Sequence, residues 1–98
     1  MKISDVYDEL KSFGICKSEN EFSKNYLCKD RNYLSVLRCR GSTPSIAVLM
    51  VLSTNLQQRS QVLKNSKHKS VREVGARLTE IHKMIISGVL EECATRNH

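Results

Sequence analysis

Apolar positions at the start of the chain recur at three- and four-residue steps, the spacing of one face of an α-helix. In MKISDVYDELKSFG these positions are Ile3, Val6, Tyr7, Leu10 and Phe13. Acidic residues fall on the opposite side. The pattern predicts a helix over residues 4–13, with Ser4 as its cap and Gly14 directly after its end.

A second, short helix is predicted over residues 19–27. Ser18 followed three residues later by Glu21 has the form of a capping box. The apolar face of this helix is narrow, because it rests mainly on Phe22 and Tyr26. The helix is therefore expected to end before the polar stretch at residues 28–30.

Two further helices are predicted in the next stretch of the chain. Asp30 is expected to cap the third helix, and Gly41 to end it. Thr43 is expected to cap the fourth, with Pro44 in its first turn, where a missing amide hydrogen costs nothing. No helix breaker follows until about Asn65, so the fourth helix is expected to extend past the core as a polar projection.

The last predicted helix is long and begins after Ser70 as its cap. Its apolar residues step by three and four in a heptad-like rhythm. They include Val71, Val74, Leu78, Ile81, Ile85 and Val89. Gly75 and Gly88 lie inside this helix, where each costs roughly 1 kcal/mol relative to Ala. Such a glycine marks either the close approach of another helix or a site where the loss is tolerated.

Composition supports an all-α fold. The chain has 98 residues, 40% of them apolar, with one Pro and four Gly. These are too few turn-forming residues for the many turns of a β-fold. We expect an N-terminal bundle of about four helices, with the long C-terminal helix folding back as an antiparallel hairpin. The predicted parts are residues 1–56 and a helical extension at 57–98, within a single compact unit.

The charge balance favours a polyanionic partner. Lys and Arg number 16 against 10 Asp and Glu, a formal charge of +6, which points to nucleic acid first and to an acidic protein or membrane surface second. No apolar signal segment follows Met1, and the longest apolar run, residues 46–52, is far short of the ~20 residues that cross a bilayer. We therefore expect a cytoplasmic protein that does not bind membranes.

Two short helices joined by a tight corner, at residues 19–27 and 31–40, form the arrangement of a helix-turn-helix. In that motif the second helix enters the DNA major groove with its N-terminal residues at the base edges. Arg31 would read guanine, Asn32 adenine, and Ser35 bases or phosphates. The predicted DNA-contacting residues are Lys29, Arg31, Asn32, Ser35, Arg38 and Arg40. The alternative is that these side chains form only the solvated face of a short helix.

Residues 18–56 resemble the lambda-repressor-type (Xre-like) helix-turn-helix. The matching positions are Ser18, Phe22, Ser23, Leu27, Tyr33, Val36, Leu37, Arg38, Arg40, Gly41, Pro44, Ser45, Ile46, Leu49 and Leu52. More narrowly, they are similar to a group of short uncharacterised bacterial proteins that share an F-S-x-x-x-L-G-R-S…L-x-x-R-G-x-x-P-S pattern. The resemblance implies a compact DNA-binding fold with Arg31, Asn32, Ser35 and Arg38 on the recognition helix. Cys28 departs from the motif's usual Gly, and Asp30 from its common Ser.

Two further surfaces are predicted in the C-terminal part. A second basic cluster brackets the corner between the last two helices and consists of Arg59, Lys64, Lys67, Lys69 and Arg72. It is either a solvated tip or a set of phosphate contacts. The broad apolar stripe of the last helix predicts a homodimer through Val74, Leu78, Ile81, Ile85 and Val89, which would present paired recognition helices to two half-sites. The alternative is that this helix packs only on its own chain.

No catalytic, metal or cofactor site is predicted. His68, His82 and His98 lack nearby Cys or acidic partners at catalytic or metal-ligand spacing. The four Cys have no CxxC spacing and are expected to be free thiols. The sequence predicts a sequence-specific binder of double-stranded DNA, a small transcriptional regulator and not an enzyme. The alternative function is a helical interaction module, an adaptor or inhibitor, whose basic surface meets an acidic protein.

Overall fold

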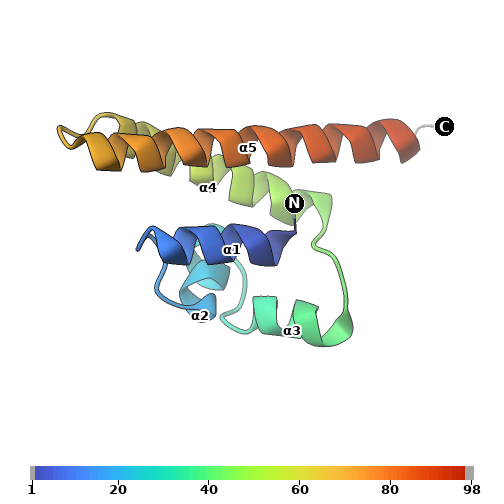
Figure 1. Cartoon of the computed structure of the whole chain (residues 1–98). Helices are drawn as coiled ribbons and strands as arrows, with labels where there is room; N and C mark the ends of the chain where they lie inside the picture. The colour runs from blue at the N-terminus through green and yellow to red at the C-terminus, as the bar shows by residue number, and fades with distance from the viewer. Residues whose placement is uncertain (1, 97–98) are drawn as a thin grey trace. The chain divides into compact units, whose positions relative to one another are not determined.

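The structure is a computed structural model and describes residues 2–96, which contain helices and no strand (Figure 1). The elements are α1 Ile3–Ser12, α2 Glu19–Glu21, the π-helical turn η1 Phe22–Tyr26, α3 Tyr33–Arg40, α4 Ile46–Lys64 and α5 Lys69–Arg96. The predicted all-α class is confirmed. No helix in this part of the chain is long and apolar enough to cross a membrane.

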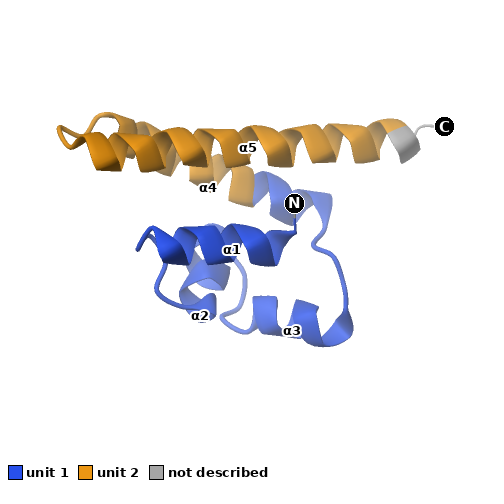
Figure 2. Cartoon of the chain, in the orientation of Figure 1, with its two compact units in different colours: residues 1–51 blue, residues 52–98 orange. Residues whose placement is uncertain are grey.

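The chain divides into two compact units, Met1–Val51 and Leu52–His98 (Figure 2). The division falls inside α4, whereas the sequence placed it after residue 56. Helix α4 therefore contributes its first residues to unit 1 and the rest to unit 2.

The core of unit 1 is built around three aromatic rings. The centroids of Tyr7 and Phe22 lie 5.6 Å apart and those of Phe22 and Tyr26 6.0 Å apart. Leu10 and Leu34 are fully buried, as is Phe22. Burial of one such side chain stabilises the fold by about 1.5–3 kcal/mol, so these few residues hold the short helices of unit 1 in place.

Two predicted helix ends and one predicted cap are confirmed in unit 1, whereas the prediction that Ser4 caps the first helix is wrong, because α1 begins at Ile3 and its N-cap residue is Lys2. Gly14 and Gly41 have φ values of 75° and 60°, in the left-handed region that glycine enters at little cost. Gly41 is the C-cap of α3, and its amide donates to the Arg38 carbonyl. The Ser18 hydroxyl accepts a hydrogen bond from the Glu21 amide at 3.2 Å, as expected for the cap of α2.

The beginning of α3 differs from the prediction. Its first residue is Tyr33 and Asn32 is the preceding cap residue. The Asp30 carboxylate accepts the Asn32 amide at 2.9 Å, which closes a local turn before the helix. The prediction that Asp30 caps α3 is therefore wrong, and Arg31 and Asn32 precede the helix.

The first residues of α4 and α5 also differ from the prediction. Helix α4 begins at Ile46, and the Ser45 hydroxyl accepts the Val48 amide at 3.3 Å. Ser45 therefore does the capping expected of Thr43, because its hydroxyl is the one placed beneath the first turn. Helix α5 begins at Lys69, before the predicted cap Ser70.

The second predicted helix contains a π-helical turn that the periodicity did not indicate. The Leu27 amide donates to the Phe22 carbonyl at 3.2 Å, and the Lys29 amide donates to the Ser23 carbonyl at 2.9 Å. Cys28 then has φ of 55°, in the left-handed region. This widened turn and the left-handed residue reverse the chain direction before α3.

In unit 2, residues 52–64 of α4 pack antiparallel to α5 (Figure 1). Leu52 and Leu56 of α4 are fully buried, as are Leu78 and Ile81 of α5. The predicted antiparallel hairpin is confirmed. The stretch of α4 after Leu56, which was expected to project past the core, packs against α5 at Ser60, whose side chain is buried.

Close backbone approach and buried polar contacts join the two helices of the hairpin. A Cβ at Gly75 would lie 3.0 Å from the Lys64 backbone nitrogen, so of the two interpretations for this glycine the close approach is correct. The Ser60 hydroxyl donates to the Gly75 carbonyl at 2.8 Å and lies 2.5 Å from the Thr79 hydroxyl. At Gly88 a Cβ would meet nothing within 4 Å.

Candidate nucleic-acid interface

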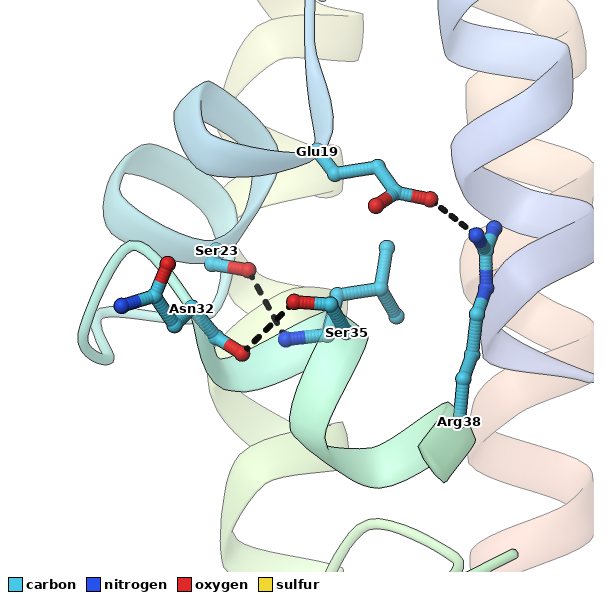
Figure 3. A network of polar contacts seen from close by, with 6 residues as sticks. Glu19, Ser23, Asn32, Ser35 and Arg38 are labelled. Atoms are coloured by element: carbon cyan, nitrogen blue, oxygen red, sulfur yellow. Dashed lines mark hydrogen bonds and ion pairs between the residues drawn. The ribbon is translucent and has the colours of Figure 1, made fainter. Parts of the chain in front are cut away.

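The start of α3 is anchored by a serine on the preceding turn. The Ser23 hydroxyl, which is fully buried, accepts the Leu34 amide at 3.2 Å (Figure 3). An amide in the first turn of a helix has no partner within that helix, so Ser23 satisfies a group that would otherwise be buried without one. This bond fixes where α3 begins relative to η1.

Arg31 and Asn32 lie at the corner that this bond holds in place, and both are exposed. The Asn32 carboxamide points away from the network in Figure 3. Ser35, also exposed, donates its hydroxyl to the Asn32 carbonyl at 3.2 Å, and its oxygen can still accept a bond. The three side chains predicted to read bases therefore lie at the surface around the first turn of α3.

The charges at this corner are largely positive. Residues 29–40 contain four Lys and Arg and one acid, Asp30, whose carboxylate is bonded to the Asn32 amide. The Lys29 ammonium lies 5.9 Å from the centroid of the Tyr33 ring, within range of a cation–π contact. The Lys29 ammonium group therefore lies close to the start of α3, and the residue is exposed.

The other two predicted contacts lie at the opposite end of α3. Arg38 and Arg40 occupy its last turn, where cations interact favourably with the helix dipole. The Arg38 guanidinium also forms an ion pair with Glu19 of α2 (Figure 3). The six predicted residues therefore form two groups, and Arg38 already has an anionic partner within the chain.

The second basic cluster lies on and around the turn between α4 and α5. Arg59, Lys64, Lys67, Lys69 and Arg72 are all exposed. The Arg72 guanidinium donates to the carbonyl oxygens of Ser66 and Lys67, each at 3.1 Å. Arg72 therefore shapes the turn that carries the cluster.

The residues predicted for a dimer interface are largely inside the single chain. Leu78 and Ile81 have no exposed surface, and Ile85 and Val89 are 9% and 6% exposed. Val74 is half-buried. The exposed large apolar side chains of α5 are instead Met84 and Leu90.

Nothing in residues 2–96 groups three or more His, Cys, Asp or Glu side chains where they could hold a metal ion. His82 Nδ1 lies 2.9 Å from the Ser53 carbonyl oxygen and 2.6 Å from its hydroxyl. These contacts with Ser53 join α5 to α4 through His82. His98 lies outside the described residues.

All four Cys are free thiols, as predicted. Cys16 is buried, and its sulfur donates to the Ser18 carbonyl at 3.3 Å. Burial, with a smaller contribution from the charge of Glu21, raises the pKa of the Cys16 thiol, and an interaction with the Ser18 backbone partly offsets this. A thiol with a raised pKa is a poor nucleophile at neutral pH.

Two residues that shape the interface were not predicted as parts of it, Glu19 and Ser23. Ser23 stood in the matched F-S pattern, which was a usable signal for a fixed role at that position. Glu19 was seen only as part of a capping box, and nothing in the spacing indicated its ion pair with Arg38.

Comparison with known proteins gives a family and no assigned activity. No curated protein matches the chain, and no solved structure matches it. The model of a family of unknown function, DUF6626, matches residues 3–97, and the chain therefore belongs to that family.

Proposed function

We propose that this protein binds double-stranded DNA in a sequence-dependent way, as a small transcriptional regulator. The observation that carries the proposal is the exposure of Arg31 and Asn32 side by side at the buried anchor of α3. A guanidinium and a carboxamide are the groups that read guanine and adenine in the major groove. Rigid support beneath them is what a base-reading site needs.

The resemblance to the lambda-repressor-type helix-turn-helix supports the proposal. Cys28 occupies the position where the motif's turn usually has glycine, and its φ of 55° is the conformation that glycine favours. The Asp30 carboxylate is engaged by the Asn32 amide, so part of its repulsion toward a phosphate backbone is offset. Both departures from the motif are thus compatible with a corner of the same kind.

A test compares two double variants of the full chain. A pool of random duplexes is first used to select a preferred sequence. Arg31→Ala with Asn32→Ala is expected to abolish the preference, since a bidentate Arg contact contributes about 1–3 kcal/mol of discrimination. Lys17→Ala with Asn20→Ala, which removes one positive charge and one carboxamide from exposed positions, is expected to keep it.

The leading alternative is a helical interaction module with a basic surface. No mobility shift at low salt, or a preference unchanged by the first double variant, would contradict DNA reading and favour that alternative.

A homodimer is a second element of the proposal, because two α3 helices would then meet two half-sites. Because Leu78 and Ile81 are buried within the chain, a dimer of this conformation would have to use other surfaces than these two residues. Sedimentation of the unchanged chain tests this element, and a monomer contradicts it.

A further inference from the structure

The turn between α4 and α5, with the helix ends beside it, has a strong excess of basic over acidic residues. Residues 57–72 contain five Lys and Arg and no Asp or Glu. We call these five residues the hairpin tip: Arg59, Lys64, Lys67, Lys69 and Arg72. The acid-free stretch around them is longer still, since no Asp or Glu occurs between Asp30 and Glu73.

The tip cations are exposed and are not neutralised by the chain itself. Within the described residues, Arg59, Lys64, Lys67 and Lys69 have no ion pair, whereas Arg38 is paired with Glu19 and Arg77 with Glu80. Exposed cations without a carboxylate partner keep their full charge for a ligand. The tip is therefore a concentrated positive surface.

Local hydrogen bonds hold the turn that carries this charge. The Arg72 guanidinium and the Ser66 hydroxyl each close a bond within the turn, the second accepting the His68 amide at 3.2 Å. Helix α5 begins at Lys69 and has no acidic residue in its first turn. Lys69 and Arg72 lie at the N-terminal end of α5, where cations oppose the helix dipole, whereas Lys64 lies in the last turn of α4, where a cation is favourable. A bound anion would offset the unfavourable part at the start of α5.

The composition of the tip indicates which anion. Residues 57–72 contain no aromatic residue, and lysine is depleted from protein–protein interfaces, whose central contacts are rich in Tyr, Trp and Arg. Phosphate groups of nucleic acid are instead neutralised by clustered Lys and Arg with no need for an apolar centre.

We propose that the hairpin tip binds the phosphate backbone of duplex DNA without reading its sequence, and that it supplies a large part of the electrostatic affinity. The inference deepens the proposed DNA binding, and it depends on that function for the choice of duplex DNA as the polyanion. It assigns sequence preference to the α3 corner and sequence-independent attachment to the tip.

The test uses the full chain and a random-sequence DNA duplex, with affinity measured by fluorescence anisotropy over a series of potassium chloride concentrations. The tip variant combines Arg59→Gln, Lys64→Gln, Lys67→Gln and Lys69→Gln, and keeps Arg72 because it shapes the turn. The control variant combines Lys11→Gln, Lys17→Gln, Lys24→Gln and Lys83→Gln. Both remove four charges from exposed positions, and thermal melting verifies that both remain folded.

The tip variant is expected to weaken binding at least tenfold at low salt. Each lost phosphate contact lowers the slope of log K against log salt by about 0.9, so four lost contacts lower it by about 3 to 4. The control variant is expected to change the slope by less than about 1. Equal losses in both variants would reduce the effect to net charge and overturn the proposal, as would an unchanged slope in the tip variant.

Two further outcomes separate this inference from the proposed function. In the first, the unchanged chain binds DNA without preferring any sequence, while the tip variant still shows a lower slope of log K against log salt. In that case sequence reading is wrong and the tip proposal stands. If polyglutamate competes with the duplex as well as an equal charge of unlabelled DNA does, the tip fits an acidic protein and the proposal is overturned.

Discussion

The two units of this chain fix their backbones in different ways. Unit 1 joins short helices through a π-helical turn and a left-handed Cys28, and places α3 through one buried hydroxyl. Unit 2 consists of two long helices with an aliphatic seam. The position of a surface side chain in unit 1 thus depends on a few local bonds, while in unit 2 it follows from regular packing.

The units also differ in how they carry charge. Unit 1 has eight Lys and Arg against six Asp and Glu, and unit 2 has eight against four. Each unit has an ion pair, Glu19 with Arg38 in unit 1 and Glu80 with Arg77 in unit 2. The difference is that the excess of positive charge is larger in unit 2 and is gathered in residues 57–72, which contain no acid.

The largest effect on stability is expected from Ser23→Ala in unit 1. It leaves the buried Leu34 amide without its acceptor, which costs about 1–3 kcal/mol. Ser35→Ala removes an exposed hydroxyl bonded to a backbone carbonyl and is expected to cost less than about 0.5 kcal/mol. Urea unfolding of both variants measures the difference, and equal costs would show that Ser23 is not the anchor of α3.

A smaller effect is expected from two glycines of α5 in unit 2. Gly75→Ala and Gly88→Ala both gain about 1 kcal/mol in helix propensity. At Gly75 the new methyl group meets the Lys64 backbone, which cannot rotate away, and overpacking of this kind costs about 1–3 kcal/mol. Gly88→Ala should therefore be the more stable variant by at least about 1 kcal/mol in thermal unfolding. Equal stabilisation would mean that the helices of the hairpin are free to separate there.

The smallest effect is expected from the titration of Cys16 in unit 1. Its pKa is raised above the ordinary 9.0 by burial, so the unfolded thiol ionises at lower pH than the folded one. The contribution of Cys16 to stability is then complete below about pH 9 and is lost as pH rises toward the folded pKa. Cys16→Ala should flatten the pH dependence of the unfolding free energy in this range, relative to the unchanged chain.

The exposed Cys39 provides the control for that measurement. Cys39→Ala is expected to leave the pH dependence as it is in the unchanged chain. A dependence that Cys39→Ala removes and Cys16→Ala retains would contradict the assignment to the buried thiol.

The parts of the fold that follow from repeated or strongly local signals could be predicted from the amino-acid sequence. The steps of apolar residues predicted the antiparallel hairpin, because a long helix has one face to bury, but they also led to Leu78 and Ile81 being assigned to a dimer interface, whereas both are buried within the chain. Gly14, Gly41 and Ser18 correctly predicted two helix ends and a cap, since each supplies a conformation or a bond that the adjacent backbone requires. The predicted exposure of Arg31 and Asn32 also agrees with the structure.

The contacts between residues distant in sequence could not be predicted and became visible in the folded chain. The π-helical turn, the bond from the Leu34 amide to Ser23 and the Arg38–Glu19 pair depend on how η1 and α3 pack. The burial of Ile81 against its own chain was equally open, because an apolar stripe does not say which surface will cover it. The spacing of apolar residues shows that one face of a helix must be buried. Which surface covers that face depends on packing and loop closure across the whole unit.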